Sequence, residues 1–187
     1  MLNDPRSRRG FLGSVGGAAA VWLTAPWPEL LLAGAEPDLG QPIRYRALTP
    51  SEATELEAMA AQIIPTDDTP GAREARVVVF IDRSLATFAK SQRTLIVEGL
   101  VQLHGDAARR RPGVPSFAAL AGPDQIAILK KLDAAKSPFF EAVRVATITG
   151  LLANPSYGGN FGKVGWKLIG FDDRFSWQAP FGYYDRP

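Results

Sequence analysis

The sequence predicts an all-α fold: a single small domain of about five helices that ends in an irregular C-terminal segment rich in glycine and aromatic residues. Two observations favour this fold class. Each strong apolar pattern repeats about every 3.6 residues, the period of an α-helix, and no stretch alternates for long as a half-buried strand would. The 187 residues, less a leader at the N-terminus, suffice for one domain of ordinary size.

The first expected helix has the clearest start. Thr49 suits the N-cap position and Pro50 the first helical position, while Glu52 completes a capping box. Apolar residues then recur on one face, and Pro65 ends the pattern. These signals predict a helix that starts at Pro50 and stops before Pro65.

A loop with two adjacent carboxylates, Asp67 and Asp68, comes next. Such a pair could bind a cation or act in acid–base chemistry, but we favour structural capping, because neighbouring residues rarely converge on one atom. A second helix is expected from about residue 71 to residue 89. Its apolar stripe is interrupted by Asp82 and Arg83, which we place at the margin of the buried face.

Three further helices are expected over residues 94–110, 125–135 and 139–152, the last introduced by Ser137 and Pro138. The third helix ends in the basic run 109–111, which we interpret as a solvated helix end suited to the helix dipole. The fifth is apolar enough to be central and mostly buried.

Composition excludes several kinds of site. The chain has no cysteine and one histidine, His104, which rules out disulfides, cysteine-ligated iron–sulfur clusters, C-x-x-C-H haem attachment and the usual zinc sites. We interpret His104 as a surface or capping residue, and we expect no cofactor in this chain. A net charge of +2 disfavours nucleic acid as a partner, and a mean hydropathy of −0.03 argues against multiple membrane spans.

The N-terminal residues resemble a twin-arginine translocation signal. The motif comprises Ser7, Arg8, Arg9, Phe11 and Leu12. A stretch rich in glycine and alanine follows, and Ala33 and Ala35 form an A-x-A cleavage pattern. We therefore assign residues 1–35 to a signal peptide and residues 36–187 to the mature domain, and we expect export to the periplasm. An uncleaved membrane anchor is the alternative, although two prolines interrupt the apolar run.

The twin-arginine route carries folded cargo, usually because a cofactor was inserted in the cytoplasm. This chain offers no evident cofactor ligands. We therefore expect it to escort a partner that carries the cofactor.

Residues 157–171 hold five glycines and two lysines among aromatic and aliphatic residues. Glycines permit close approach of another surface, and exposed aromatics are common interface anchors. We interpret this segment, with the aromatic tail after it, as a docking surface. The candidate contact residues are Tyr157, Asn160, Trp166, Lys167, Trp177 and Tyr184. The alternative is a glycine-rich turn followed by a short buried element that carries Val164, Trp166, Leu168 and Ile169.

Three motifs together resemble the gluconate 2-dehydrogenase subunit 3 family. They are I-I-P-T-D-D-T-P-G-A from residue 63, F-I-D-R from residue 80, and N-P-x-Y-G-G-N-x-G-K-V-G-W-K-L-I-G-F from residue 154. The resemblance covers nearly all of the mature chain. It implies a small exported subunit of a periplasmic dehydrogenase complex, partnered with a large FAD-containing flavoprotein and often with a multihaem cytochrome c. It also implies that the chain has no cofactor of its own and no catalytic residues to transfer from the family.

We therefore expect a non-catalytic accessory subunit that is needed for export and stability of the flavoprotein, and that meets the membrane only through the complex. Two alternatives remain. The chain could be a transient export chaperone, or a free-standing periplasmic binding protein or hydrolase that uses Asp67, Asp68 or His104. The sequence of this chain does not identify the substrate of the complex.

Overall fold

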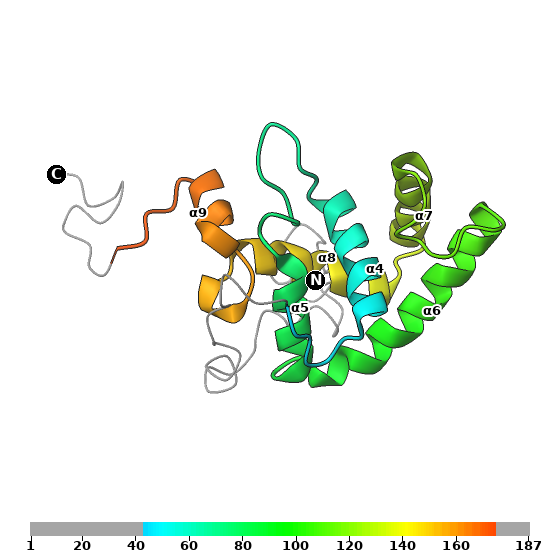
Figure 1. The fold of residues 1–187 in the computed structure, drawn as a ribbon, viewed down its shortest axis with the longest axis horizontal. Helices are drawn as coiled ribbons and strands as arrows, with labels where there is room; N and C mark the ends of the chain where they lie inside the picture. The colour runs from blue at the N-terminus through cyan, green and yellow to red at the C-terminus, as the bar shows by residue number, and fades with distance from the viewer. Residues whose placement is uncertain (1–42, 175–187) are drawn as a thin grey trace, which may run out of the picture.

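The structure is a computed structural model that describes residues 43–174. Within these residues it confirms the all-α prediction, with six α-helices, three short 3-10 helices and no strand (Figure 1). The elements in order are α4 (Pro50–Ile63), α5 (Val77–Ala86), η1 (Lys90–Gln92), α6 (Arg93–Arg110), α7 (Gly122–Ala134), α8 (Pro138–Leu152), η2 (Pro155–Tyr157), η3 (Phe161–Lys163) and α9 (Val164–Leu168).

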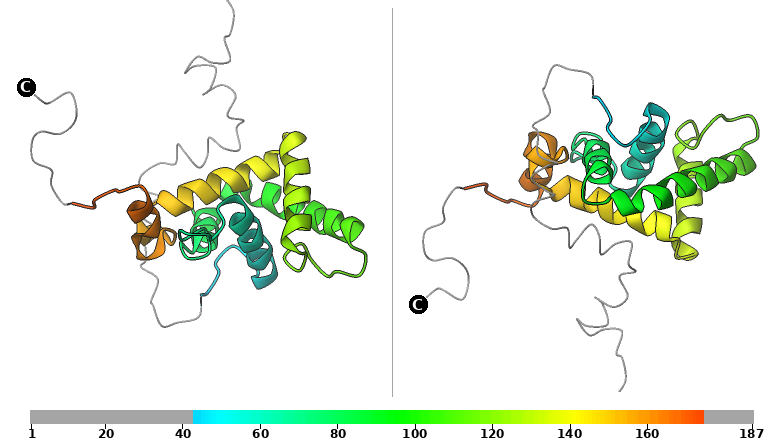
Figure 2. Two further views of the ribbon diagram at one scale, coloured as in Figure 1. Left: turned by 90° about the horizontal axis from the view of Figure 1, so that it is seen from above. Right: turned by 90° about the horizontal axis from the view of Figure 1, so that it is seen from below.

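Helix α8 organises the domain. It contacts each of the other α-helices of the described part. Helix α7 crosses near its N-terminal end, and η2, η3 and α9 fold over its C-terminal end (Figure 2). As a result, α9 lies at one end of the molecule and the far parts of α6 and α7 lie at the other (Figure 1).

The predicted caps are confirmed. The Thr49 hydroxyl accepts a hydrogen bond from the Glu52 amide, and the Glu52 carboxylate accepts one from the Thr49 amide at 2.8 Å, so the capping box is complete. At the start of α8, the Ser137 hydroxyl accepts from the Phe140 amide. Helix α7 begins at Gly122, earlier than expected, because a proline is tolerated in the first turn of a helix.

The expected second helix was too long at its start. Helix α5 begins only at Val77, because Arg76 adopts a left-handed conformation (φ 51°) that a continuing α-helix cannot contain. The residues before it form turns, closed by a hydrogen bond from the Ala72 amide to the Ile64 carbonyl. Asp82 and Arg83 are buried, at 2% and 8% exposure, so their placement at the helix margin was wrong.

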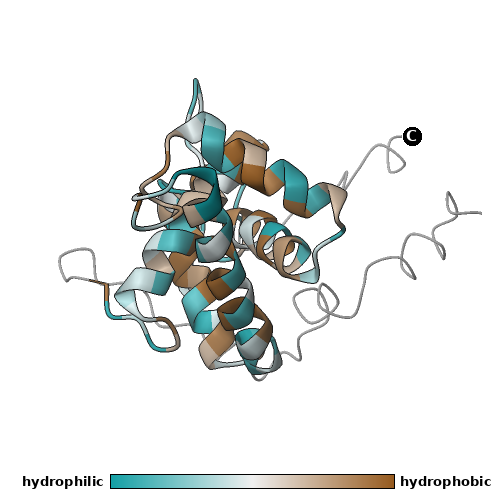
Figure 3. Cartoon of the chain, turned by 90° about the vertical axis from the view of Figure 1, so that its right-hand side faces the viewer, coloured by the Kyte–Doolittle hydropathy of each residue, from teal (hydrophilic) through white to brown (hydrophobic). Residues whose placement is uncertain are grey.

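The core lies between the helices, and apolar and polar residues alternate around each helix (Figure 3). Phe80 and Ile81 of α5 are fully buried, as are Val143 and Thr147 of α8. Ile126 of α7 and Ile148 of α8 instead lie at the surface, 41% and 40% exposed. None of the helices in residues 43–174 is long and apolar enough to cross a membrane.

Candidate interaction surface

The glycine-rich segment packs its backbone directly against the last turns of α8. A Cβ at Gly159 would collide with the Gly150 carbonyl, and a Cβ at Gly165 would collide with the Leu151 carbonyl. Only glycine permits this close approach. The glycines therefore fix η2, η3 and α9 onto the end of α8.

Asn160 joins the C-terminus of α8 to the N-terminus of α9. Its side chain is fully buried, donates a hydrogen bond to the Ala153 carbonyl at 2.9 Å, and accepts one from the Gly165 amide at 2.8 Å. Both backbone groups lie at helix ends, where they lack helical partners. Asn160 also adopts a left-handed conformation (φ 46°), which asparagine tolerates better than most residues. It is thus a structural residue, and its side chain, which we expected to contact a partner, is buried within the domain.

Trp166 makes a second connection to α8. Its indole Nε1 donates a hydrogen bond to the Leu152 carbonyl at 2.8 Å, which satisfies another carbonyl of the last helical turn. Its ring meets Phe171 edge-on, with ring centroids 5.1 Å apart. Trp166 is half-buried, so one part of the ring holds α9 in place and another part stays accessible.

The segment is also fixed to α5 and to the turn before it. Arg83 donates a hydrogen bond from Nη1 to the Ser156 carbonyl at 3.1 Å. The Phe161 amide donates to the Ala75 carbonyl at 3.1 Å, and the Arg76 guanidinium lies 3.8 Å from the centre of the Phe161 ring. Residues 154–165 are therefore a folded part of the domain, held from two sides.

Beyond this anchored part, large apolar side chains remain open to solvent. Leu168, Ile169 and Phe171 are 44%, 59% and 47% exposed. Leu152 and Ile148, one helical turn apart on α8, are also exposed. We call this set, together with the half-buried Trp166, the α9 patch: it comprises Ile148, Leu152, Trp166, Leu168, Ile169 and Phe171.

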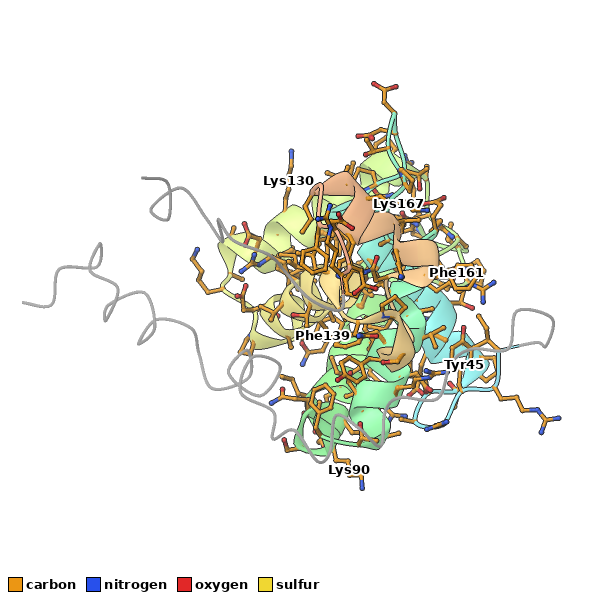
Figure 4. The ribbon with its side chains drawn as sticks, turned by 90° about the vertical axis from the view of Figure 1, so that its left-hand side faces the viewer. Tyr45, Lys90, Lys130, Phe139, Phe161 and Lys167 are labelled. Atoms are coloured by element: carbon orange, nitrogen blue, oxygen red, sulfur yellow. The ribbon has the colours of Figure 1, made fainter. Side chains whose placement is uncertain are left out.

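Basic residues flank the α9 patch. Lys167 is exposed and makes no ion pair within residues 43–174. Lys163 instead pairs with Asp173 at 2.8 Å and lies 5.9 Å from the centre of the Trp166 ring. Figure 4 looks onto this end of the domain, with Lys167 on α9 and Phe161 on the turn beside it. An apolar centre with a charged margin is the usual make-up of a protein interface.

The alternative interpretation of this segment, a short buried element, was wrong for its most apolar members. Val164 packs against the core, but Leu168 and Ile169 face solvent. Among the predicted contact residues, Lys167 is exposed while Tyr157 and Trp166 are half-buried. The remaining candidates lie outside the described residues, as do the leader residues: Trp177, Tyr184, Ser7, Arg8, Arg9, Phe11, Leu12, Ala33 and Ala35.

The residues of the alternative hydrolase hypothesis are not brought together. Asp67 accepts hydrogen bonds from the amide and hydroxyl of Thr69, which lower the pKa of its carboxyl, and this is the capping role that we expected. Asp68 and His104 are exposed, and neither makes a hydrogen bond or ion pair within the described part. No group of three or more histidine, aspartate or glutamate side chains in residues 43–174 could hold a metal ion.

Sequence reasoning missed the role of the F-I-D-R motif. Asp82 is buried, and its carboxylate accepts hydrogen bonds from the amides of Arg46, Ala47 and Leu48 at 2.8 to 3.0 Å. Two charged residues inside an apolar helix were the available signal, since buried charges occur where partners compensate them. The motif thus serves the fold by holding neighbouring segments.

A small all-α domain with an apolar, lysine-flanked surface at one end has the features of an interaction module. The model of the family described as gluconate 2-dehydrogenase subunit 3 matches residues 50–173, and the chain belongs to this family. The chain therefore has a role of the gluconate 2-dehydrogenase subunit 3 type, and members of this family are subunits of a multi-subunit dehydrogenase complex. Searches of curated proteins and of solved structures returned no significant match.

Proposed function

We propose that this chain is a non-catalytic small subunit of a periplasmic FAD-dependent dehydrogenase complex that oxidises a sugar or alcohol. Its task is to support export and stability of the flavoprotein subunit, which it contacts through the α9 patch. A multihaem cytochrome c is a second partner of the assembled complex. The observation that carries this proposal is the α9 patch itself, because it is apolar, exposed and held in a fixed conformation.

A fixed surface favours binding because little conformational freedom is lost on association. The buried Asn160 beneath α9 and Trp166 of the α9 patch both form side-chain hydrogen bonds to the backbone of the domain. The neighbouring Leu168 and Ile169 are thus presented to a partner from an anchored helical turn. Aromatic and aliphatic side chains of this kind are the common centres of stable subunit interfaces.

The leader supports the export part of the proposal. Arg8 and Arg9 stand in a twin-arginine pattern, a signal for proteins that cross the membrane folded. A subunit that binds its flavoprotein partner before translocation would bring that partner through the same route. The leader would then act for two chains.

The experiment replaces Arg8 and Arg9 by lysine in a tagged full-length chain and measures the flavoprotein in the periplasm and cytoplasm. We expect both proteins to stay in the cytoplasm as a yellow complex that copurifies on the tag. The matched control is Arg6→Lys, which changes a basic residue outside the motif and leaves export intact. A flavoprotein that reaches the periplasm beside the double-lysine variant would contradict the escort role.

A further inference from the structure

We propose that residues 175–187 lie across the α9 patch in the free subunit and that a partner must displace them. The proposed cover of the patch in the free subunit rests on the described residues and on the sequence alone. The competition with a partner rests on the function proposed above.

The first argument is reach. The described chain ends at Arg174, three residues after Phe171, which is itself part of the α9 patch. The following thirteen residues, 175–187, can span about 40 Å when extended, at roughly 3.3 Å per residue. Helix α9 has five residues and is about 8 Å long at 1.5 Å per residue. Residues 175–187 are therefore long enough to run along α9 and beyond it.

The second argument is chemical match. Residues 175–187 contain five aromatic residues, namely Phe175, Trp177, Phe181, Tyr183 and Tyr184. The α9 patch offers the exposed part of Trp166 and the edge-on ring of Phe171, flanked by aliphatic side chains. Aromatic rings pack well against such a surface in edge-to-face and offset geometry. The exposed apolar side chains of the patch gain by leaving water, and aromatic side chains such as those of residues 175–187 gain strongly from burial.

The third argument is effective concentration. A segment attached by a short linker has an effective concentration in the millimolar range at its own binding site. An intrinsic dissociation constant of about 1 mM would therefore already fill the α9 patch about half of the time. Contacts between the aromatic rings of residues 175–187 and the six apolar side chains of the patch therefore need to supply only millimolar affinity.

Such a cover changes how the subunit meets other proteins. When only a fraction of the free subunit has an open patch, the apparent dissociation constant of a partner rises by the inverse of that fraction. The cover also shields Leu168, Ile169 and Phe171 from weak, nonspecific contacts before assembly. A partner with a well-fitting surface still binds, while a poorly fitting one does not displace the tail.

The test compares amide hydrogen exchange in the full chain and in a chain that ends at Arg174. We expect residues 164–171 to exchange several-fold faster without the tail, while amides of α6, at the other end of the domain, stay unchanged. A synthetic peptide of residues 175–187 added to the shortened chain restores slow exchange, and a peptide with all five aromatics replaced by serine does not. Equal exchange rates at residues 164–171 in the two chains would overturn the proposal.

A second variant keeps the length of the chain: Trp177→Ser combined with Phe181→Ser. It should accelerate exchange at residues 164–171 as the shortened chain does. Binding to the isolated flavoprotein then separates the two proposals, since we expect the shortened chain to bind several-fold more tightly. If the shortened chain binds the flavoprotein more weakly and its amides at residues 164–171 exchange at an unchanged rate, the tail contacts the partner and the proposed cover is overturned. A third outcome separates the proposals differently. Exchange at residues 164–171 could be faster without the tail while substitutions in the α9 patch leave flavoprotein binding unchanged. That result would support the cover and overturn the proposed docking function.

Discussion

Asp82 and Arg83, consecutive residues of the buried helix α5, hold segments from opposite ends of the described chain. The Asp82 carboxylate accepts hydrogen bonds from the amides of residues 46–48 at 2.8 to 3.0 Å, and Arg83 donates to the Ser156 carbonyl at 3.1 Å. Helix α5 thereby links the start of the domain to the segment that carries the α9 patch. A substitution at Asp82 or Arg83 should therefore also affect segments distant in the sequence, at residues 46–48 and at Ser156.

Replacement of Asp82 by asparagine should lower the free energy of unfolding by about 2 kcal/mol or more, because buried hydrogen bonds to a charged group are lost. The new amide nitrogen would face backbone donors at residues 46–48, which it cannot accept from. Urea denaturation measures the loss. The matched control is Asp68→Asn, an exposed position without a hydrogen bond in the described part, where we expect no measurable change. Equal stabilities of the two variants would refute the anchoring role of Asp82.

Replacement of Asn160 by alanine should cost about 2 to 4 kcal/mol. Two backbone groups, the half-buried Ala153 carbonyl and the buried Gly165 amide, would lose their partner, and alanine is disfavoured at φ 46°. Hydrogen exchange should show that α9 opens first. Asn154→Ala removes only an exposed cap at the start of η2 and should cost about 1 kcal/mol or less. If the Asn160→Ala variant instead loses stability as one cooperative unit and α9 does not open first, Asn160 does not act as a local connection between α8 and α9.

The capping box of α4 predicts a pH dependence. Burial alone would raise the pKa of Glu52, but hydrogen bonds from Thr49 and Arg93 lower it below its ordinary value of 4.5. A carboxyl with a lowered pKa in the folded state stabilises the protein above pH 4.5, and this contribution is lost as the pH falls through the folded-state pKa. Glu52→Gln should therefore cost about 1 kcal/mol at neutral pH, and the difference should shrink in acid.

Thermal unfolding at several pH values between neutral pH and pH 3 measures the stability difference between the original chain and the Glu52→Gln variant. Glu98→Gln is the matched control, because Glu98 is exposed on α6 and makes no hydrogen bond or ion pair within the described residues. Its stability should run parallel to that of the original chain at every pH. If the stability difference between the original chain and the Glu52→Gln variant stays constant as the pH falls, protonation of the Glu52 carboxyl is not coupled to folding.

Local signals in the sequence predicted the fold class and most helix starts. Thr49 and Ser137 act through neighbours three residues away, so the sequence itself contains both partners of each cap. The start of α5 could not be predicted in this way, because it depends on the left-handed conformation of Arg76 and on a turn closed against Ile64. Those contacts form only when the chain folds.

Composition singled out residues 157–171, but it did not predict the structural roles of the individual residues within them. Asn160 looks like a polar loop residue in the sequence, yet it is buried between two helix ends. Leu168 and Ile169 look like core residues, yet they are exposed. Hydrophobicity alone does not tell which side of a five-residue helix faces the domain, since α9 is too short for a clear period.

Leu168 and Ile169 test the proposed interface more cleanly than Trp166 does. Because the Trp166 indole binds the Leu152 carbonyl, its loss would destabilise the domain as well as any interface. Leu168 and Ile169 are 44% and 59% exposed, so a polar substitution there should leave the stability of the free subunit within about 0.5 kcal/mol. Effects on folding and on association can therefore be separated at these two positions.

Leu168→Asp and Ile169→Asp should each weaken binding to the flavoprotein subunit by about 2 kcal/mol or more, roughly 30-fold, because a buried interface centre would have to accept an unpaired charge. Titration calorimetry with the purified flavoprotein measures the change, and thermal unfolding of the free subunit confirms that the fold is intact. The matched control is Val101→Asp: Val101 is 69% exposed on α6, away from α9. We expect the control to bind normally. If Leu168→Asp and Val101→Asp bind equally well, the α9 patch is not the contact surface.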